Sequence, residues 1–156
     1  MSGGRLSALE CRIPPVAQVI FIAAAMYLVS VTVPVGRLGL PKLLGVVFIL
    51  VGVAIVLLGV REFTLAQTTL DPRDPDKSEH LVVRGIYRYS RNPMYAGFFV
   101  ALLGWALWLG QAPGLLLLPV FVAYMNRFQI QPEERRMQEK FGREFELYRA
   151  RVRRWI

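Results

Sequence analysis

Three long tracts of the sequence carry no Asp, Glu, Lys or Arg: residues 13–36, 43–60 and 92–126. Each tract reaches or exceeds the roughly 18 residues that indicate a membrane span. Gly, Gln and Pro interrupt the third tract at 110–114, so it predicts two short helices in a hairpin. We therefore expect an all-α, polytopic membrane protein in one domain, with about four transmembrane helices over residues 14–34, 42–62, 93–110 and 114–130.

The placement of basic residues predicts how these spans are oriented. Of the 19 Lys and Arg residues, all but Arg37 and Lys42 lie before residue 13, within 61–91 or after 126. Loops rich in Lys and Arg stay in the cytoplasm, so we expect both termini and the loop 67–91 there. This fits a bacterial or archaeal inner membrane. Because the basic residues flank apolar spans, the net charge of +8 favours lipid headgroups over nucleic acid as partners.

Small residues recur at helical spacing in two of the expected spans. Such stripes let two helices approach closely in lipid, so we expect the two spans to pack through them. The stripe in the second span is Gly45, Gly52 and Gly59, and the one in the third is Gly97, Ala101 and Gly104.

The polar C-terminal segment predicts an amphipathic helix over residues 132–149. Pro132 and the carboxylates of Glu133 and Glu134 suit the first turn of a helix. An apolar face follows at spacings of three and four residues, which favours a cytoplasmic helix on or near the membrane. Cys11 is the only cysteine, so the chain has neither an intramolecular disulfide nor a Cys-rich metal site, and we expect no metal.

Residues 84–97 combine three arginines, three tyrosines and an Asn-Pro step next to an uncharged helical run. Asn92 is a typical N-cap residue, and Pro93 suits the first turn because it lacks an N–H. Helix N-termini bind anionic groups, so this border of the membrane is a candidate site for a polar, partly anionic small molecule. The alternative interpretation is that the Arg and Tyr residues only mark the cytoplasmic interface.

Four segments taken together resemble the isoprenylcysteine carboxyl methyltransferase family, whose broad pattern phospholipid methyltransferases share. They are residues 81–87, 91–97, 133–134 and 141–148. The resemblance implies an integral membrane methyltransferase that uses S-adenosylmethionine, with its cofactor pocket at the cytoplasmic border. Carried over by position, the cofactor-binding residues are His80, Leu81, Val82, Tyr87, Asn92, Pro93, Met94, Tyr95 and Glu133.

Further expectations depend on the same resemblance. The family more often has His where this chain has Asn92, so a role that needs a protonated imidazole is absent there, whereas hydrogen bonding is retained. Arg127 lies near the end of the last span and is either an interfacial anchor on that span or a contact to the substrate. The implied methyl acceptor is lipophilic or amphipathic and enters from the membrane. The resemblance assigns no catalytic residue, and it defines neither the acceptor's nucleophilic atom nor an oligomeric state.

Two other functions remain open at this point. Membrane reductases that bind a nicotinamide cofactor have a similar Arg-His-Pro pattern, but an acidic residue commonly follows their Tyr-Gly step. Here Phe98, Phe99 and Val100 follow Gly97, which favours the methyltransferase pattern. The second alternative is a non-enzymatic membrane scaffold or transporter subunit, but the polar features gather at one face and no ion pathway is visible in the spans.

Overall fold

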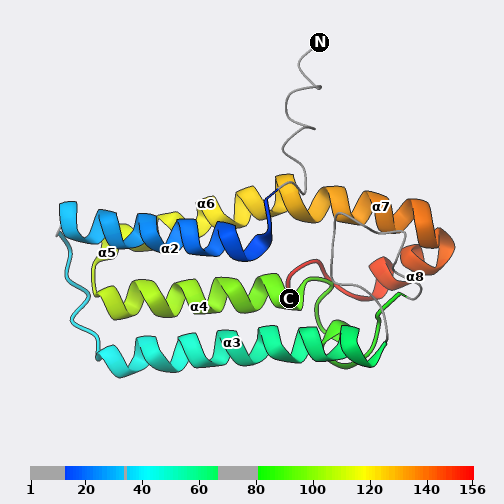
Figure 1. Cartoon of the computed structure of the whole chain (residues 1–156), viewed down its shortest axis with the longest axis horizontal. Coiled ribbons are helices and arrows are strands. Elements are labelled where there is room, and N and C mark those ends of the chain that lie inside the picture. The colour runs from blue at the N-terminus through cyan, green and yellow to red at the C-terminus, as the bar shows by residue number, and fades with distance from the viewer. Residues whose placement is uncertain (1–12, 34, 67–80) are drawn as a thin grey trace, which may run out of the picture.

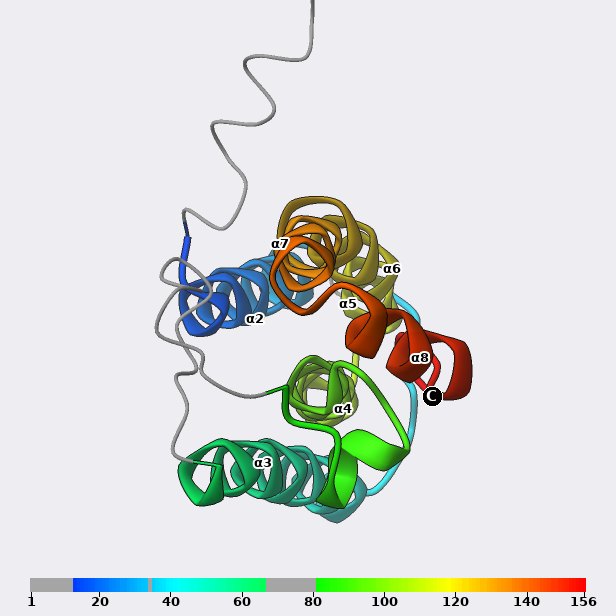
Figure 2. The same ribbon diagram turned by 90° about the vertical axis from the view of Figure 1, so that its right-hand side faces the viewer.

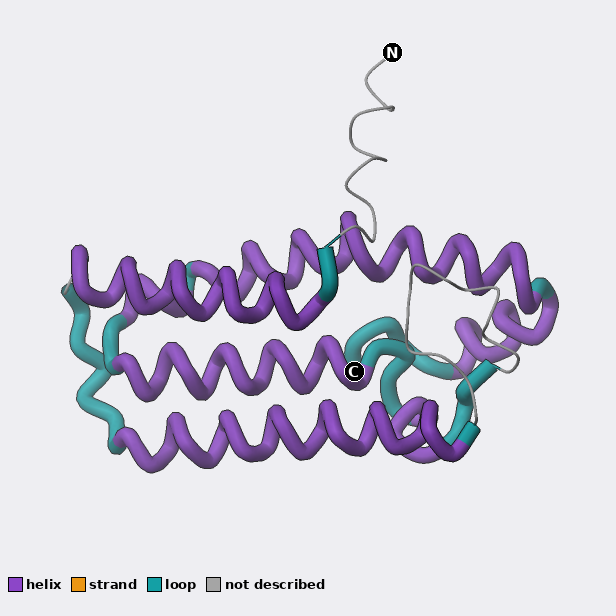
Figure 3. The backbone as a smooth tube through the Cα atoms, in the orientation of Figure 1, coloured by secondary structure: helices purple, strands orange, loops and turns teal. Residues whose placement is uncertain are grey.

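The computed structural model describes residues 13–33, 35–66 and 81–156, and within these residues it confirms the all-α prediction (Figure 3). The three longest helices are α2 (Pro15–Thr32), α3 (Lys42–Leu65) and α4 (Pro93–Leu109). The shorter elements are the 3₁₀ turn η2 (Gly85–Arg88), α5 (Ala112–Leu115), α6 (Leu117–Tyr124), the π-helical turn η3 (Met125–Ile130), α7 (Gln131–Phe141) and α8 (Arg143–Arg151).

Helix α4 occupies the middle of the bundle. It lies between α3 on one side and the α2 and α6 layer on the other (Figures 1 and 2). Helix α2 packs against α4, α5 and α6. The side chains at the centre of this packing are almost fully buried, and they include Met26, Leu102, Phe121 and Met125.

The predicted glycine contact between the second and third apolar segments is confirmed. A Cβ atom at Gly52 would lie 2.5 Å from both the Gly97 carbonyl oxygen and the Ala101 amide nitrogen. A Cβ atom at Gly45 would lie 2.7 Å from the Gly104 carbonyl oxygen. Because backbone meets backbone along this seam, α3 and α4 can approach closely only where these positions lack side chains.

The end of the bundle opposite α7 and α8 is closed by backbone hydrogen bonds between two connectors. Helix α4 ends at Gly110, whose φ of 71° lies in the left-handed region that favours glycine. The Leu38 amide donates to the Gly110 carbonyl at 3.0 Å, and the Ala112 amide donates to the Gly36 carbonyl at 3.0 Å. These bonds fix the connector after α2 against the hairpin after α4.

The last apolar segment and the polar helix after it form one continuous rod, which corrects the sequence analysis. In Figure 1, α6 leads through η3 into α7 without a bend in the chain. Pro132 lacks an N–H, so it leaves the Phe128 carbonyl without its usual partner just where the π-helical turn ends. Gly142, with φ of 48°, then ends the rod, and α8 begins at the next residue. Residues 132–149 are therefore two helices rather than the single helix that the pattern predicts.

Two of the helices are long and apolar enough to cross a membrane, namely α2 and α3. Helix α4 is as apolar but has 17 residues. Large apolar side chains on α2 and α3 point outward rather than into the bundle, such as Phe21, which is 72% exposed, and Leu50, which is 62% exposed. Such surfaces are stable in hydrocarbon and unfavourable in water.

Candidate functional site

The candidate site lies at the start of α4, where the sequence predicts that Asn92 caps the helix and Pro93 begins it. Pro93 occupies the first turn, as predicted, and is buried. Asn92 does not cap the helix with its side chain, which corrects that prediction. Instead its Nδ2 atom donates to the Arg154 carbonyl at 2.9 Å. The first-turn N–H groups of α4 therefore gain no side-chain acceptor from Asn92.

One turn into α4, Tyr95 contacts the acidic start of α7. The Tyr95 hydroxyl donates to Oε1 of Glu133 at 2.7 Å, and Nε2 of Gln129 donates to the same oxygen at 2.6 Å. Gln129 is fully buried and Tyr95 is 7% exposed. We call Tyr95, Gln129 and Glu133 the Glu133 cluster. Two neutral donors hold this carboxylate in one orientation, where the rod passes the start of α4.

Burial has a large effect on the charge of Glu133. Although the residue is partly exposed as a whole, its carboxyl group is buried. This burial raises the pKa of the Glu133 carboxyl from 4.5 to about 7, and the hydrogen bonds from Tyr95 and Gln129 and the charge of Arg136 offset part of the rise. The carboxyl group therefore takes up a proton near neutral pH unless a cation lies beside it.

The next residue, Glu134, belongs to a different network. Its Oε1 atom accepts from Nη2 of Arg91 at 2.7 Å, and its Oε2 atom accepts from Nη2 of Arg154 at 2.5 Å. Burial alone would raise the pKa of Glu134, but the hydrogen bonds from Arg154 and Arg91 outweigh it and lower the pKa. We call Arg91, Glu134 and Arg154 the Glu134 cluster. The Glu134 carboxylate is therefore ionised at neutral pH, whereas the Glu133 carboxyl group is only partly ionised.

The Glu134 cluster fixes the end of the chain over the start of α4. The Arg91 amide donates to the Arg153 carbonyl at 2.9 Å, and Nε1 of Trp155 donates to Oδ1 of Asn126 at 3.0 Å. Together with the Asn92 bond to Arg154, these contacts hold residues 152–155, which we call the terminal strap. The strap joins the loop before α4 to α7 and to the π-helical turn η3.

Tyr87 and Met94 face α3 rather than the Glu133 cluster. The Tyr87 ring meets Phe63 edge-on, with centroids 5.4 Å apart, and Tyr87 is 5% exposed. A Cβ atom at Gly59 would lie 2.5 Å from Cγ of Met94. Burial raises the pKa of the Tyr87 hydroxyl, with smaller contributions from Tyr148, Glu133 and Glu62. Tyr87 therefore stays neutral and serves as packing between η2 and α3.

The remaining predicted residues are spread around this centre. Val82 is buried, and Leu81 before it is half-buried. Arg127 lies in η3 with its guanidinium 5.4 Å from the Phe128 ring. His80 lies outside the described residues. Tyr95 thus contacts Glu133, whereas Tyr87 and Met94 pack against α3. Asn92 binds the terminal strap.

Several residues that the sequence analysis passed over take part in the site. Gln129 precedes Glu133 by four residues, the spacing that places two side chains on one helix face, so this partner was detectable. The roles of Arg91 and Arg154 could not be predicted, because their ion pairs with Glu134 form only when the terminal strap folds back. Tyr148 donates to the Tyr87 carbonyl at 2.7 Å and fastens α8 to η2.

The chemistry of the Glu133 cluster is that of a binding site for hydroxyl or cationic groups. A carboxylate accepts hydrogen bonds from hydroxyls and pairs with ammonium groups, and Tyr95 and Gln129 fix its direction. The N-terminus of α4 lies one turn away and attracts negative charge. A ligand that carries both signs of charge complements this pair.

Comparison with known proteins gives one matching family and two similar proteins. The family model for phospholipid methyltransferases matches residues 40–144. An uncharacterized protein of Haemophilus influenzae is 41% identical over 63 residues, which are 40% of this chain and all of that protein. The protein-S-isoprenylcysteine O-methyltransferase of Schizosaccharomyces pombe is 36% identical over 77 residues, which are 49% of this chain and 33% of that enzyme. No solved structure matches the chain.

Proposed function

The chain belongs to the phospholipid methyltransferase family, and on this premise we propose that it transfers a methyl group from S-adenosylmethionine to a lipophilic or amphipathic acceptor. The transfer takes place at the cytoplasmic face of the membrane. The observation that carries the proposal is the enclosed Glu133 carboxylate, held by Tyr95 and Gln129 beside the N-terminus of α4.

The residues at this place fit the chemical groups of S-adenosylmethionine. The cofactor has a carboxylate, an ammonium, a sulfonium, two ribose hydroxyls and a flat adenine. First-turn N–H groups of α4 suit the carboxylate, since Pro93 begins the helix and Asn92 does not cap it. The Glu133 carboxylate suits the ammonium or the ribose hydroxyls as an acceptor.

The raised pKa of Glu133 adds a second argument for a cationic ligand. A carboxyl group with a pKa of about 7 is only partly ionised at neutral pH. A positive charge placed beside it favours the ionised form, so binding a cation and ionising Glu133 promote one another. Tyr95 and Gln129 stabilise that ionised form, because both donate hydrogen bonds to Oε1.

Methyl transfer requires little acid–base catalysis by the protein. When bound, the cofactor supplies an activated methyl group with a good leaving group. The chain's own residues bind the cofactor, orient it and exclude water, which are the contributions that in-line displacement needs most. We keep the remaining residues that the resemblance assigns to the cofactor as proposed cofactor contacts, and Arg127 as a candidate substrate contact. The proposed cofactor contacts are His80, Leu81, Val82, Tyr87 and Met94.

We further propose that the chain crosses an inner membrane four times, with α2, α3, α4 and the α6–η3 rod as the spans. The Glu133 cluster then lies at the cytoplasmic border, in line with the basic residues of α7, α8 and the loop before α4. Helix α7 extends the rod beyond the membrane, and α8 folds back beneath it (Figure 1). Both termini are cytoplasmic in this arrangement, and a lipophilic acceptor reaches the site sideways through the membrane.

A binding experiment tests the proposal directly. The full chain, purified in detergent, is titrated with S-adenosylmethionine, its demethylated product and reduced nicotinamide cofactors in a calorimeter. We expect micromolar or tighter binding of the first two, a binding free energy of about −8 kcal/mol. Binding of a reduced nicotinamide, with none of S-adenosylmethionine, overturns the methyltransferase proposal in favour of a membrane reductase.

A further inference from the structure

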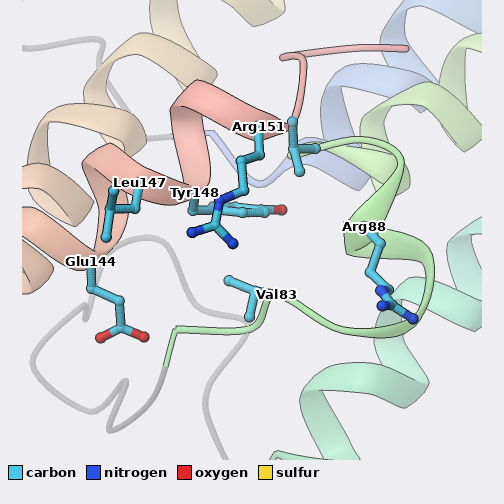
Figure 4. Close-up of a pocket in the computed structure, with 7 residues that line it drawn as sticks. Val83, Arg88, Glu144, Leu147, Tyr148 and Arg151 are labelled. Carbon is cyan, nitrogen blue, oxygen red and sulfur yellow. The ribbon is translucent and has the colours of Figure 1, made fainter.

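A pocket lies away from the Glu133 cluster, between α8 and the segment that leads into α4. Its volume is ≈ 490 Å³, and none of the proposed cofactor-binding residues lines it. Val83, Leu147 and Val152 form apolar walls, Tyr148 forms the back, and Arg88, Arg151 and Glu144 supply charge (Figure 4). We call this the α8 pocket.

The pocket is a fixed feature, because the elements on its two sides are tied together. The Tyr148 hydroxyl donates to the Tyr87 carbonyl at 2.7 Å, joining α8 to η2. The Val152 amide donates to the Tyr148 carbonyl at 3.0 Å, where α8 gives way to the terminal strap. The Tyr148 bond thus sets the spacing between α8 and η2 at this pocket.

The two arginines of the α8 pocket differ from their basic neighbours. Within residues 13–33, 35–66 and 81–156, Arg88 and Arg151 form no ion pair or hydrogen bond through their side chains. Arg91 and Arg154, in contrast, share Glu134, and Arg143 pairs with Glu146 at 3.2 Å. Figure 4 shows the Arg151 guanidinium extending into the open space in front of Tyr148. Among the described residues, no carboxylate neutralises these two guanidinium groups.

The pocket lies at the level where a membrane surface is expected. Gly85 in η2 is in contact with the carboxyl group of Glu62, and Arg61 and Glu62 are the first charged residues after the apolar part of α3. Around the pocket, apolar side chains are open to the outside: Val83 and Leu147 are each 42% exposed, and Tyr89 is 78% exposed. Basic and apolar side chains mixed at this depth are typical of a surface that meets lipid headgroups.

We propose that the α8 pocket binds the phosphodiester headgroup of an anionic phospholipid, as a docking site separate from the site of methyl transfer. Arg151, whose guanidinium lies in front of Tyr148, contacts the phosphate, and Arg88 adds positive charge from the other side of the pocket. Val83 and Leu147 contact the glycerol and upper acyl region. Two arginines and the carboxylate of Glu144 leave the pocket with one net positive charge, which balances the single negative charge of a phosphodiester.

Lipid binding to the full chain in detergent tests this proposal by native mass spectrometry. The probes are short-chain phosphatidylglycerol, short-chain phosphatidylcholine and inorganic phosphate. We expect phosphatidylglycerol to bind most tightly, and Arg88→Gln and Arg151→Gln each to weaken it about fivefold. Arg151→Lys, which keeps the charge, retains part of the affinity. Arg143→Gln is the matched control, because Arg143 lies on the same helix outside the pocket, and it leaves binding unchanged.

Several outcomes overturn the proposal. An equal loss in Arg143→Gln shows that only overall charge matters, and equal binding of phosphatidylcholine shows that the phosphate is not held by a net positive pocket. Competition by inorganic phosphate at the same concentration assigns the pocket to free phosphate. Loss of S-adenosylmethionine affinity in Arg151→Gln assigns it to the cofactor. Failure of S-adenosylmethionine to bind the wild type leaves the lipid result intact, so the two proposals fail separately.

Discussion

Arg91 and Glu134 are 43 residues apart in the sequence, yet Nη2 of Arg91 lies 2.7 Å from Oε1 of Glu134. Their side chains are only 10% and 12% exposed, so the pair is largely shielded from water. The contact connects the loop before α4 to the start of α7, and Arg154 of the terminal strap completes it. It is therefore a structural joint that sets the position of the neighbouring Glu133.

We predict that Glu134→Gln destabilises the protein strongly. Removing one charge from a buried pair leaves the other charge unpaired, and such changes cost about 3 kcal/mol or more. Here two guanidinium groups lose their partner. Unfolding in detergent, followed by circular dichroism against temperature, measures the loss. Glu139→Gln is the control, since Glu139 is an exposed residue of the same helix. Equal melting temperatures for the two variants would contradict the structural role of Glu134.

We also predict that Gly52→Leu separates α3 from α4. A side chain there would meet the backbone of Gly97 and Ala101 at 2.5 Å, and backbone atoms cannot move aside as flexible side chains do. We expect a loss of more than about 3 kcal/mol of stability, since overpacking of movable side chains alone costs 1–3 kcal/mol. Ala54→Leu is the matched control, because Ala54 lies on the exposed face of α3. If both variants melt alike, the glycine seam does not hold the two helices together.

Much of the fold was predictable because its signals are local or periodic. The uncharged tracts mark the helices, Gly110 marks the end of α4, and the seven-residue spacing of Gly45, Gly52 and Gly59 predicts the face that meets α4. The continuous rod through η3 was not predictable in this way. A proline is expected at a helix start, and nothing local shows that the chain already arrives there as a helix through a π-helical turn.

The candidate site was predictable only in part, for a related reason. Glu133 and Tyr95 lie in segments that the family pattern marks, and the structure brings them together. The type and position of Asn92 predict that it caps the helix. Its partner is instead the carbonyl of Arg154, 62 residues later, and only the folding back of the terminal strap creates that contact.

The pH dependence of stability gives a test of Glu133. Its pKa in the folded protein is about 7, above the ordinary 4.5, so between these values the folded state holds a proton that the unfolded state releases. Stability from this group is therefore complete below pH 4.5 and is lost as the pH rises through 7. We predict that the melting temperature of ligand-free wild type falls from pH 5 to pH 8 more than that of Glu133→Gln.

The comparison of variants is needed because a pH range from 5 to 8 is not specific to Glu133. An unperturbed histidine side chain has a pKa of about 6.5, and the sequence contains one histidine, His80, so the slope of the wild type alone does not report Glu133. Glu134 does not interfere, because its pKa lies below 4.5. Glu139→Gln serves as control and is expected to keep the slope of the wild type. Identical slopes in wild type and Glu133→Gln would contradict the raised pKa.

The last prediction concerns the affinity of Glu133 for the proposed cofactor. Glu133→Gln keeps one acceptor oxygen but loses the charge, and a charge-assisted hydrogen bond is roughly twice as strong as a neutral one. We expect S-adenosylmethionine to bind about tenfold more weakly, which is about 1.4 kcal/mol.

The pH dependence of binding gives a second measure of the same contact. Wild-type affinity falls as the pH drops below 7, because the cation must then displace a proton from Glu133. The affinity of Glu133→Gln lacks this pH dependence. Glu139→Gln is the control, since Glu134 is committed to Arg91 and Arg154. Calorimetric titrations of the three proteins at pH 6 and pH 8 measure both effects. Equal affinities and equal pH dependence would leave Glu133 as a structural carboxylate that only fastens the rod to Tyr95 of α4.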